Sequence, residues 1–211
     1  MKPHSLFLLL LTACTFHISA QDRSKTKFGK VTPEDFAPKA YSIDSGASAV
    51  IIADIGSTEM KGNQKGSFSL EFKNFRRAHI LNKNGYDIAN VEIGIYTDGR
   101  AEEDLSGLKA VTYNLENGKV VETKLDMKSA VFKDVINKNL VIKKFTFPNI
   151  KEGSIIEYQY TLNSDFIFNL QPWSFQGDYP RLWSEYNVSV PEFYYYVTLA
   201  QGYQPFFVKE K

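Results

Sequence analysis

Nucleophilic and metal-dependent catalysis relies on a few residue types, and this chain of 211 residues holds few of them. It contains one cysteine, Cys14, and three histidines, His4, His17 and His79. A cysteine or serine nucleophile needs an imidazole within hydrogen-bond reach, and a third group must orient that imidazole. A zinc site needs several Cys or His ligands held together. We therefore expect neither kind of centre.

The amino terminus has the composition of a secretory signal peptide. A basic residue, Lys2, precedes a short apolar run over residues 6–12, and small residues follow. The run is too short to span a bilayer as a stable anchor. The small residue Ala20 predicts cleavage before Gln21. We therefore expect export to the periplasm or the cell envelope, with no transmembrane segment in the mature chain.

A second processing route remains open. Residues 11–14, Leu-Thr-Ala-Cys, resemble a bacterial lipobox. In that case Cys14 would be lipidated and would become the first residue of a lipoprotein anchored to a membrane. Contact with a membrane is expected only by this route.

Cleavage after Ala20 would leave a chain almost without catalytic side chains. It would remove Cys14, two histidines and Lys2, so that His79 is the only imidazole left. The 25 basic residues of the whole chain less Lys2 leave 24, which balance the 24 acidic ones. A net charge of zero favours neither nucleic acid nor an anionic membrane surface. We expect no disulfide, no cofactor, no metal and no enzymatic activity in the mature chain.

Two polar constellations outside the signal peptide are interpreted as structural. His79 is expected on the solvent-facing side of a strand beside Arg77, a cation that disfavours protonation of the imidazole. The basic pair Arg76-Arg77 is interpreted as a solvated strand edge. Residues 102–104, Glu-Glu-Asp, lack the spacing of an EF-hand and are interpreted as a solvated acidic loop.

The elements that would carry these side chains are strands. Phe145 and Phe147 flank a threonine, Pro148 stops the ladder, and Gly153 allows a turn. Apolar residues then alternate with polar ones from Ile156 onward. Residues 145–160 are therefore predicted to form a β-hairpin, whose apolar inner faces need a second sheet to cover them.

Further strands are predicted over residues 49–55, 68–80 and 89–95, with a bulge near Asn74 where the alternation slips. Residues 127–139 are ambiguous, and a short helix through them remains an alternative.

A second hairpin is predicted over residues 109–125. Asn117-Gly118 is the preferred pair for a type I′ turn and would set Glu116 opposite Lys119. Turn signals recur at roughly ten-residue spacing, as in two packed antiparallel sheets. These signals predict an all-β domain built as an antiparallel β-sandwich.

Aromatic residues crowd the last third of the sequence, between prolines. Trp173, Phe175, Tyr179 and Trp183 are placed on loops by these prolines and by Gly177. Exposed rings can serve as platforms for sugars, and buried ones as anchors between domains. Most rings of this stretch are expected in the core, and these four are the candidates for a partner or docking face, with a glycan platform as the alternative.

Several short motifs occur together over about residues 46–200: Arg76, Ile80-Leu81 and Gly85; Ala110, Thr112-Tyr113-Asn114 and Gly118; Phe147-Pro148-Asn149; Gly153-Ser154-Ile155-Ile156-Glu157-Tyr158; Trp173, Phe175-Gln176, Pro180 and Ser184-Glu185. Together they resemble the N-terminal domain of unknown function in secreted bacterial proteins that carry a transglutaminase-like core downstream. The resemblance implies an immunoglobulin-like sandwich without catalytic residues of its own. It also implies a transglutaminase-like domain in the same protein as its partner.

These observations divide the chain into four parts. Residues 1–20 are the signal peptide and residues 21–45 a linker or strap, which could open one helical turn at Pro33. Residues 46–200 form the sandwich, and residues 201–211 begin a downstream region that is missing. The expected function is a non-catalytic exported accessory module that positions a transglutaminase- or protease-like core or presents it with substrate. The alternative is a free-standing glycan- or protein-binding module of the cell envelope.

Overall fold

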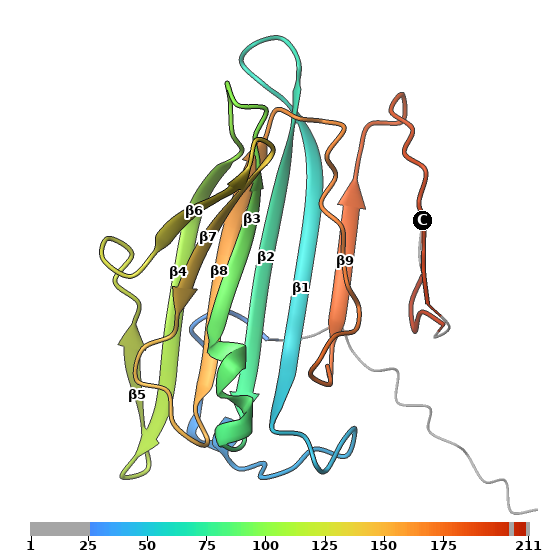
Figure 1. Cartoon of the computed structure of the whole chain (residues 1–211). Helices are drawn as coiled ribbons and strands as arrows, with labels where there is room; N and C mark the ends of the chain where they lie inside the picture. The colour runs from blue at the N-terminus through green and yellow to red at the C-terminus, as the bar shows by residue number, and fades with distance from the viewer. Residues whose placement is uncertain (1–25, 203–204, 210–211) are drawn as a thin grey trace, which may run out of the picture.

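The computed structural model describes residues 26–202 and 205–209, and most of their regular structure is β-strand (Figure 1). A six-stranded sheet packs against a three-stranded sheet, so the expected immunoglobulin-like antiparallel β-sandwich is confirmed in its two-sheet architecture. The elements of these residues are η1 (Pro33–Phe36), β1 (Ala49–Gly62), β2 (Phe68–Ile80), η2 (Lys83–Ala89), β3 (Asn90–Tyr96), β4 (Asp104–Glu116), β5 (Lys119–Lys124), β6 (Phe132–Asn137), β7 (Leu140–Thr146), β8 (Ile155–Ser164) and β9 (Ser184–Ser189), where η marks a 3-10 helix. The predicted signal peptide and Cys14 lie outside the described residues.

The large sheet has the strand order β5-β4-β8-β2-β1-β9, and the small sheet has the order β3-β7-β6. Neighbouring strands run antiparallel, except that β9 runs parallel to β1. In Figure 1, β9 and β5 lie at opposite edges of the large sheet. The described chain therefore ends beside the β9 edge.

Local sequence signals account for several of these elements. In β3, Val91, Ile93 and Ile95 are buried and alternate with exposed residues, as the period of two predicts. Between β4 and β5, Asn117 and Gly118 both have positive φ, at 50° and 75°. This is the geometry of a type I′ turn, and the pairing of Glu116 with Lys119 is confirmed.

The prediction of a hairpin over residues 145–160 is wrong. β7 belongs to the small sheet and β8 to the large one, so the connection between them crosses from one layer to the other. Neighbouring elements hold the crossing: Thr112 Oγ1 donates to the Pro148 carbonyl at 2.7 Å, and Asn114 Nδ2 donates to the Asn149 carbonyl at 3.0 Å. The sequence pattern is the same for a hairpin and for an arch between sheets, because both need two half-buried strands and a turn.

Two further local predictions are corrected. Residues 132–137 form β6, an edge strand paired with β7, and not a helix. The bulge lies in β1 between Ile51 and Ala53, opposite Arg77 and Ala78, whereas the pairing around Asn74 is regular. The slip in the β2 alternation has another cause: residues on both faces of that strand are covered.

The core lies between the sheets. Ile93 and Phe145 of the small sheet pack with Ile80, Ile156 and Tyr158 of the large one. The small sheet faces β2, β8 and β4, while the loop of residues 165–183 contacts the inner face of β1. Trp173 from this loop packs in a cluster with Phe72, Ile95, Val141 and Leu162. The loop thus covers the part of the large sheet that a fourth strand of the small sheet would otherwise cover.

Candidate functional site

His79 was expected on a wet strand face, and that expectation is wrong. Its side chain is buried, and its Nδ1 lies 2.9 Å from the hydroxyl of Tyr41. Burial and the nearby charge of Lys39 lower the pKa of His79 to about 4. The imidazole is therefore neutral near pH 7, with its ring nitrogen engaged by Tyr41. A small hollow lined by Pro38 and Glu152 lies beside it.

The acidic run at residues 102–104 is only partly solvated. Glu102 is exposed and pairs with Lys133, but Glu103 is buried and accepts a hydrogen bond from the backbone N–H of Tyr96 at 2.8 Å. The carboxylate of Glu103 thus fastens β3 to the start of β4. Across residues 26–202 and 205–209, no three Cys, His, Asp or Glu side chains gather as a metal site.

Two of the four aromatic residues predicted as a docking face pack inward. Trp173 stacks on Tyr186 with ring centroids 5.2 Å apart, and its Nε1 donates to Ser184 Oγ at 3.1 Å. Tyr179 packs against the main core, and its hydroxyl donates to Asp87. Both rings hold the loop of residues 165–183 onto the sandwich.

The other two rings point to separate places. Phe175 is exposed and meets Phe206 edge-on, with ring centroids 5.0 Å apart. Trp183 is half-buried and donates to Glu185 Oε2 at 2.9 Å, two residues along. Each of the four rings thus has its own neighbours in the described structure.

A buried carboxylate ties the same loop to β1. Asp54 Oδ2 accepts from Arg76 of β2 at 2.8 Å and from Arg181 of the loop at 2.7 Å. The Arg76 guanidinium also lies over the ring of Tyr158, 5.7 Å from its centroid. Arg181 donates in addition to the Ser174 carbonyl, so both ends of the segment 174–181 are fastened. Burial lowers the pKa of Arg181, although Asp54 opposes that effect.

The outer face of the large sheet carries a second buried ion pair, and this one corrects the prediction of a solvated Arg77. Arg77 of β2 and Glu157 of β8 are neighbours in the ladder, and their side chains are 2.5 Å apart. Only 6% and 0% of their side-chain surfaces are exposed. Two charges removed from water are tolerated only when their remaining hydrogen-bond groups are also satisfied.

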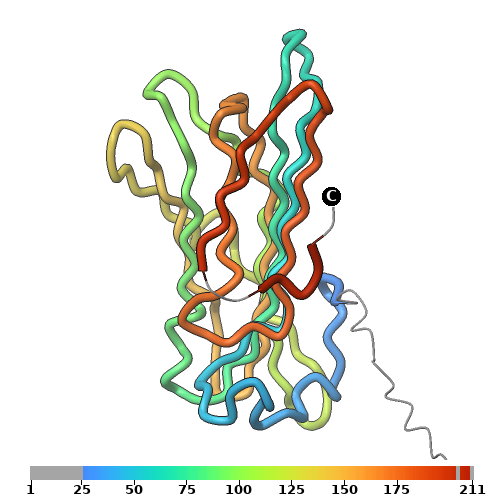
Figure 2. The backbone as a smooth tube through the Cα atoms, turned by 90° about the vertical axis from the view of Figure 1, so that its right-hand side faces the viewer, coloured from blue at the N-terminus to red at the C-terminus, as the bar shows by residue number. Residues whose placement is uncertain are grey.

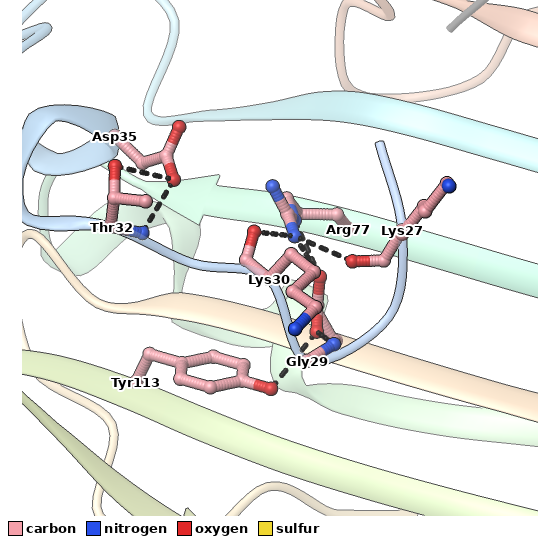
Figure 3. Close-up of polar contacts among 8 residues, drawn as sticks. Lys27, Gly29, Lys30, Thr32, Asp35, Arg77 and Tyr113 are labelled. Carbon is pink, nitrogen blue, oxygen red and sulfur yellow. Dashed lines mark hydrogen bonds and ion pairs between the residues drawn. The ribbon is translucent and has the colours of Figure 1, made fainter. Parts of the chain in front are cut away.

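The chain near its amino terminus supplies those partners. Arg77 Nη2 donates to the carbonyls of Lys27 and Lys30, at 3.2 and 2.6 Å, and Glu157 Oε2 accepts from the Gly29 backbone N–H at 2.8 Å (Figure 3). The hydroxyl of Tyr113 on β4 also donates to Glu157 Oε2, at 3.0 Å. Burial and the charge of Glu157 raise the pKa of Tyr113, so its phenol stays a donor. We call Arg77, Glu157 and Tyr113 the clamp.

Residues 26–36, which we call the strap, are held by apolar contacts as well. Phe36, at the end of η1, is buried with Val111, Tyr113 and Ile155 on the outer face of the sheet. Two partly buried strap residues, Phe28 and Val31, pack against the same cluster. The strap thus covers a sheet face that strand alternation alone would assign to solvent.

A sequence signal for this covered face exists. Ile155 and Ile156 are adjacent, so apolar side chains point to both faces of β8 at that end. An acidic residue between Ile156 and Tyr158 is unusual on a strand buried on both sides. Such a residue indicates a paired charge, but the sequence does not indicate which cation or backbone group is its partner.

An apolar row is exposed after β9. Beyond Pro191 the chain turns back and runs outside β9, on the side that Figure 2 turns toward the viewer. Phe193, Tyr195, Val197 and Leu199 are exposed by 73%, 92%, 74% and 84%, and we call these four residues the C-terminal row.

No helix of the described residues has the length and apolar character needed to cross a bilayer.

No protein-family model matches this chain, and no curated protein matches it. Among solved structures, a presumed protease from Parabacteroides distasonis is similar in part, with a TM-score of 0.44 and 13% identity. The matched region covers 56% of this chain and 23% of that protein. The chain thus spans less than a quarter of the length of this solved structure.

Proposed function

We propose that this chain is a non-catalytic, exported accessory module that positions a transglutaminase- or protease-like core, and that the core packs on the C-terminal row. The observation that carries the proposal is the exposure of four large apolar side chains at alternate positions of the segment that follows β9. Contiguous apolar surface on a soluble protein marks an interaction site.

The opposite side of the same segment supports the proposal. Tyr194 packs edge-on against Phe68 of β2, with ring centroids 5.4 Å apart, and the hydroxyl of Tyr196 donates to the Ile167 carbonyl at 2.5 Å. These contacts hold one side of the segment on the sandwich. The C-terminal row stays exposed, although Phe193 also meets Phe68, with ring centroids 5.6 Å apart.

We assign catalysis to the transglutaminase- or protease-like core because of the position of His79 in this chain. His79 is buried, engaged by Tyr41 and kept neutral by a low pKa, so it is poorly placed to serve a nucleophile. The glycan-platform alternative expects coplanar exposed rings over a groove. Trp173 and Tyr179 instead pack inward on separate partners, so the accessory-module function is the better supported of the two.

The first test is to sequence the coding region beyond Lys211 for an in-frame core with Cys, His and Asp. The second is to measure binding between this chain and that core by calorimetry. Tyr195→Asp together with Leu199→Asp is expected to weaken binding about tenfold or more, because apolar anchors dominate such interfaces. Val135→Asp on β6, which is 66% exposed, is the matched control and should change nothing. A stop codon with no core, or binding indifferent to the double variant, would falsify the proposal.

A further inference from the structure

The strap is held on the sandwich in the way that a peptide ligand is held in a groove. Residues 26–36 contain no strand and pair with no ladder of the sheet. Their contacts with the sandwich include backbone hydrogen bonds to the clamp, apolar side chains set on the cluster around Val111 and Ile155, and the ring of Phe28 edge-on to Phe75. Peptide recognition uses this same division, in which main-chain bonds provide affinity and side-chain contacts provide selectivity.

The clamp recognises a turn. Residues 27–30 form a four-residue turn closed by the Lys30 N–H and the Lys27 carbonyl at 3.1 Å. Gly29 has φ +75°, at the third position, where a type II turn requires positive φ. The turn thereby directs one N–H at the Glu157 carboxylate and two carbonyls at the Arg77 guanidinium (Figure 3).

The groove selects for a definable sequence pattern. Glycine is favoured at the positive φ, an aromatic residue precedes it, and a branched apolar residue follows at the position of Val31. Lys27 and Lys30 are exposed and contribute only their carbonyls to the clamp. The pattern is therefore aromatic–Gly–any–branched, and the two lysine side chains are free to vary.

The side chains that bind the strap backbone all belong to the large sheet. Arg77, Glu157 and Tyr113 lie on β2, β8 and β4, three strands that are hydrogen-bonded side by side. Arg77 and Tyr113 already bond Glu157, so the clamp side chains orient one another. The connection from the strap to β1 includes the exposed residues 42–46, and a turn closed by the Asp44 N–H and the Tyr41 carbonyl at 3.1 Å lies in it.

We propose that the outer face of the large sheet is a peptide-binding groove, occupied in cis by the strap, and that an extended polypeptide with an aromatic–Gly–any–branched turn can take the strap's place. The incoming segment must present the same N–H and the same pair of carbonyls, since otherwise the remaining hydrogen-bond groups of Arg77 and Glu157 would be buried without partners. The site goes beyond the proposed packing on a core, because it lies on a different face and takes a different ligand.

The test separates the strap from the sandwich without deleting it. A specific protease site is placed within residues 42–46 of the full chain, the purified protein is cut, and a fluorescent peptide spanning residues 26–41 is added. Exchange is followed by fluorescence anisotropy, and folding by near-ultraviolet circular dichroism. We expect saturable uptake of the peptide with the sandwich still folded. A peptide with Gly29→Ala should bind about tenfold more weakly because of its positive φ.

A peptide with Lys27→Ala is the matched control, since only the carbonyl of that residue is used, and it should bind within about threefold of the original. Three results would each overturn the proposal. The cut protein could unfold, it could retain its own strap against a large excess of peptide, or it could bind the Gly29→Ala peptide as tightly as the original. Each would make the strap an integral part of the fold and not an exchangeable ligand.

Discussion

At the scale of single residues, the least expected feature is how many charges the fold removes from water. Arg77 and Glu157 sit under the strap, and Asp54 sits under the loop of residues 165–183 with two arginines. Arg77 and Arg181 each donate to a carboxylate and to a backbone carbonyl of the covering segment. Arg76 donates to Asp54 and lies over the ring of Tyr158. These pairs therefore fix where a covering segment lies, beyond any stability they add.

The contribution of the Arg77–Glu157 ion pair to stability can be separated from the effect of burying each side chain. Glu157→Leu alone should lower the free energy of unfolding by about 3–5 kcal/mol, because it leaves a buried guanidinium without its counter-charge. Arg77→Leu with Glu157→Leu should cost less than the sum of the single changes. Urea unfolding of the four proteins measures this coupling. Asp165→Asn, which breaks an exposed pair with Lys65, should cost about 1 kcal/mol or less. Strict additivity of the two leucine substitutions would contradict the pairing argument.

His79 predicts how stability depends on pH. Its pKa falls from 6.5 to about 4 on folding, because burial disfavours the imidazolium and Lys39 repels it. Between pH 6.5 and about 4, the His79 imidazole is mostly protonated in the unfolded chain and mostly neutral in the folded chain. Stability should therefore be full above pH 6.5, fall as the pH drops toward 4, and level off below that. Asp35, whose charge favours the imidazolium, opposes the shift only in part.

The expected loss of unfolding free energy between pH 7.5 and pH 5 is about 2 kcal/mol from this residue alone. The measurement is urea unfolding at both values for the natural chain and for His79→Gln. Carboxylates titrate in both proteins, so the difference between the two pH slopes isolates the imidazole. Equal slopes would show that His79 does not titrate in this range.

At the scale of elements, the loop of residues 165–183 covers part of the large sheet, as a further strand of the small sheet would. It covers the inner face of β1 through the Trp173 ring and the Arg181–Asp54 bond, and it reaches β3 through Phe166, which meets Tyr96 edge-on at 4.8 Å. A loop can do this because its polar backbone groups remain partly accessible to solvent, while its rings bury the apolar face beneath.

The contact between this loop and β1 depends on Gly56. A Cβ at that position would overlap the ring of Trp173, so Gly56→Ala should push the ring off β1 and cost about 1–3 kcal/mol of unfolding free energy. Tryptophan fluorescence should shift to the red as Trp173 becomes more exposed. Gly62→Ala, on the same strand with open space around it, is the matched control. Equal effects of the two substitutions would mean that Trp173 does not depend on close approach to β1.

At the scale of the whole molecule, the two sheets are extended by two segments of opposite character. The strap buries apolar groups on the outer face of the large sheet and leaves its lysines in water. The segment after β9 does the reverse, holding Tyr194 and Tyr196 on the sandwich and exposing the C-terminal row. The outer face of the large sheet is thus covered by a segment of the same chain, whereas the C-terminal row is left exposed. This difference is why we propose a peptide groove for the first and a domain interface for the second.

The sequence by itself determined the features that depend on neighbours along the chain. Asn117 and Gly118 specify their turn because positive φ is a local property. The alternation in β3 and the helical turn beginning at Pro33 likewise need only adjacent residues. The two-layer class of the fold follows from strands that are apolar on one face, because such strands must be covered by a second layer.

Only the tertiary structure decided which strands share a sheet and which polar faces are covered. An arch and a hairpin at residues 147–154 have the same alternation of apolar and polar residues. The alternation of a strand shows that one face is buried, but it does not show which element covers that face. The pattern assigned Glu157 and His79 to solvent because they lie opposite the main core. Residues that lie 38 and 128 positions away along the chain contact His79 and Glu157 on that face, and burial by so distant a segment does not change the alternation of the strand itself.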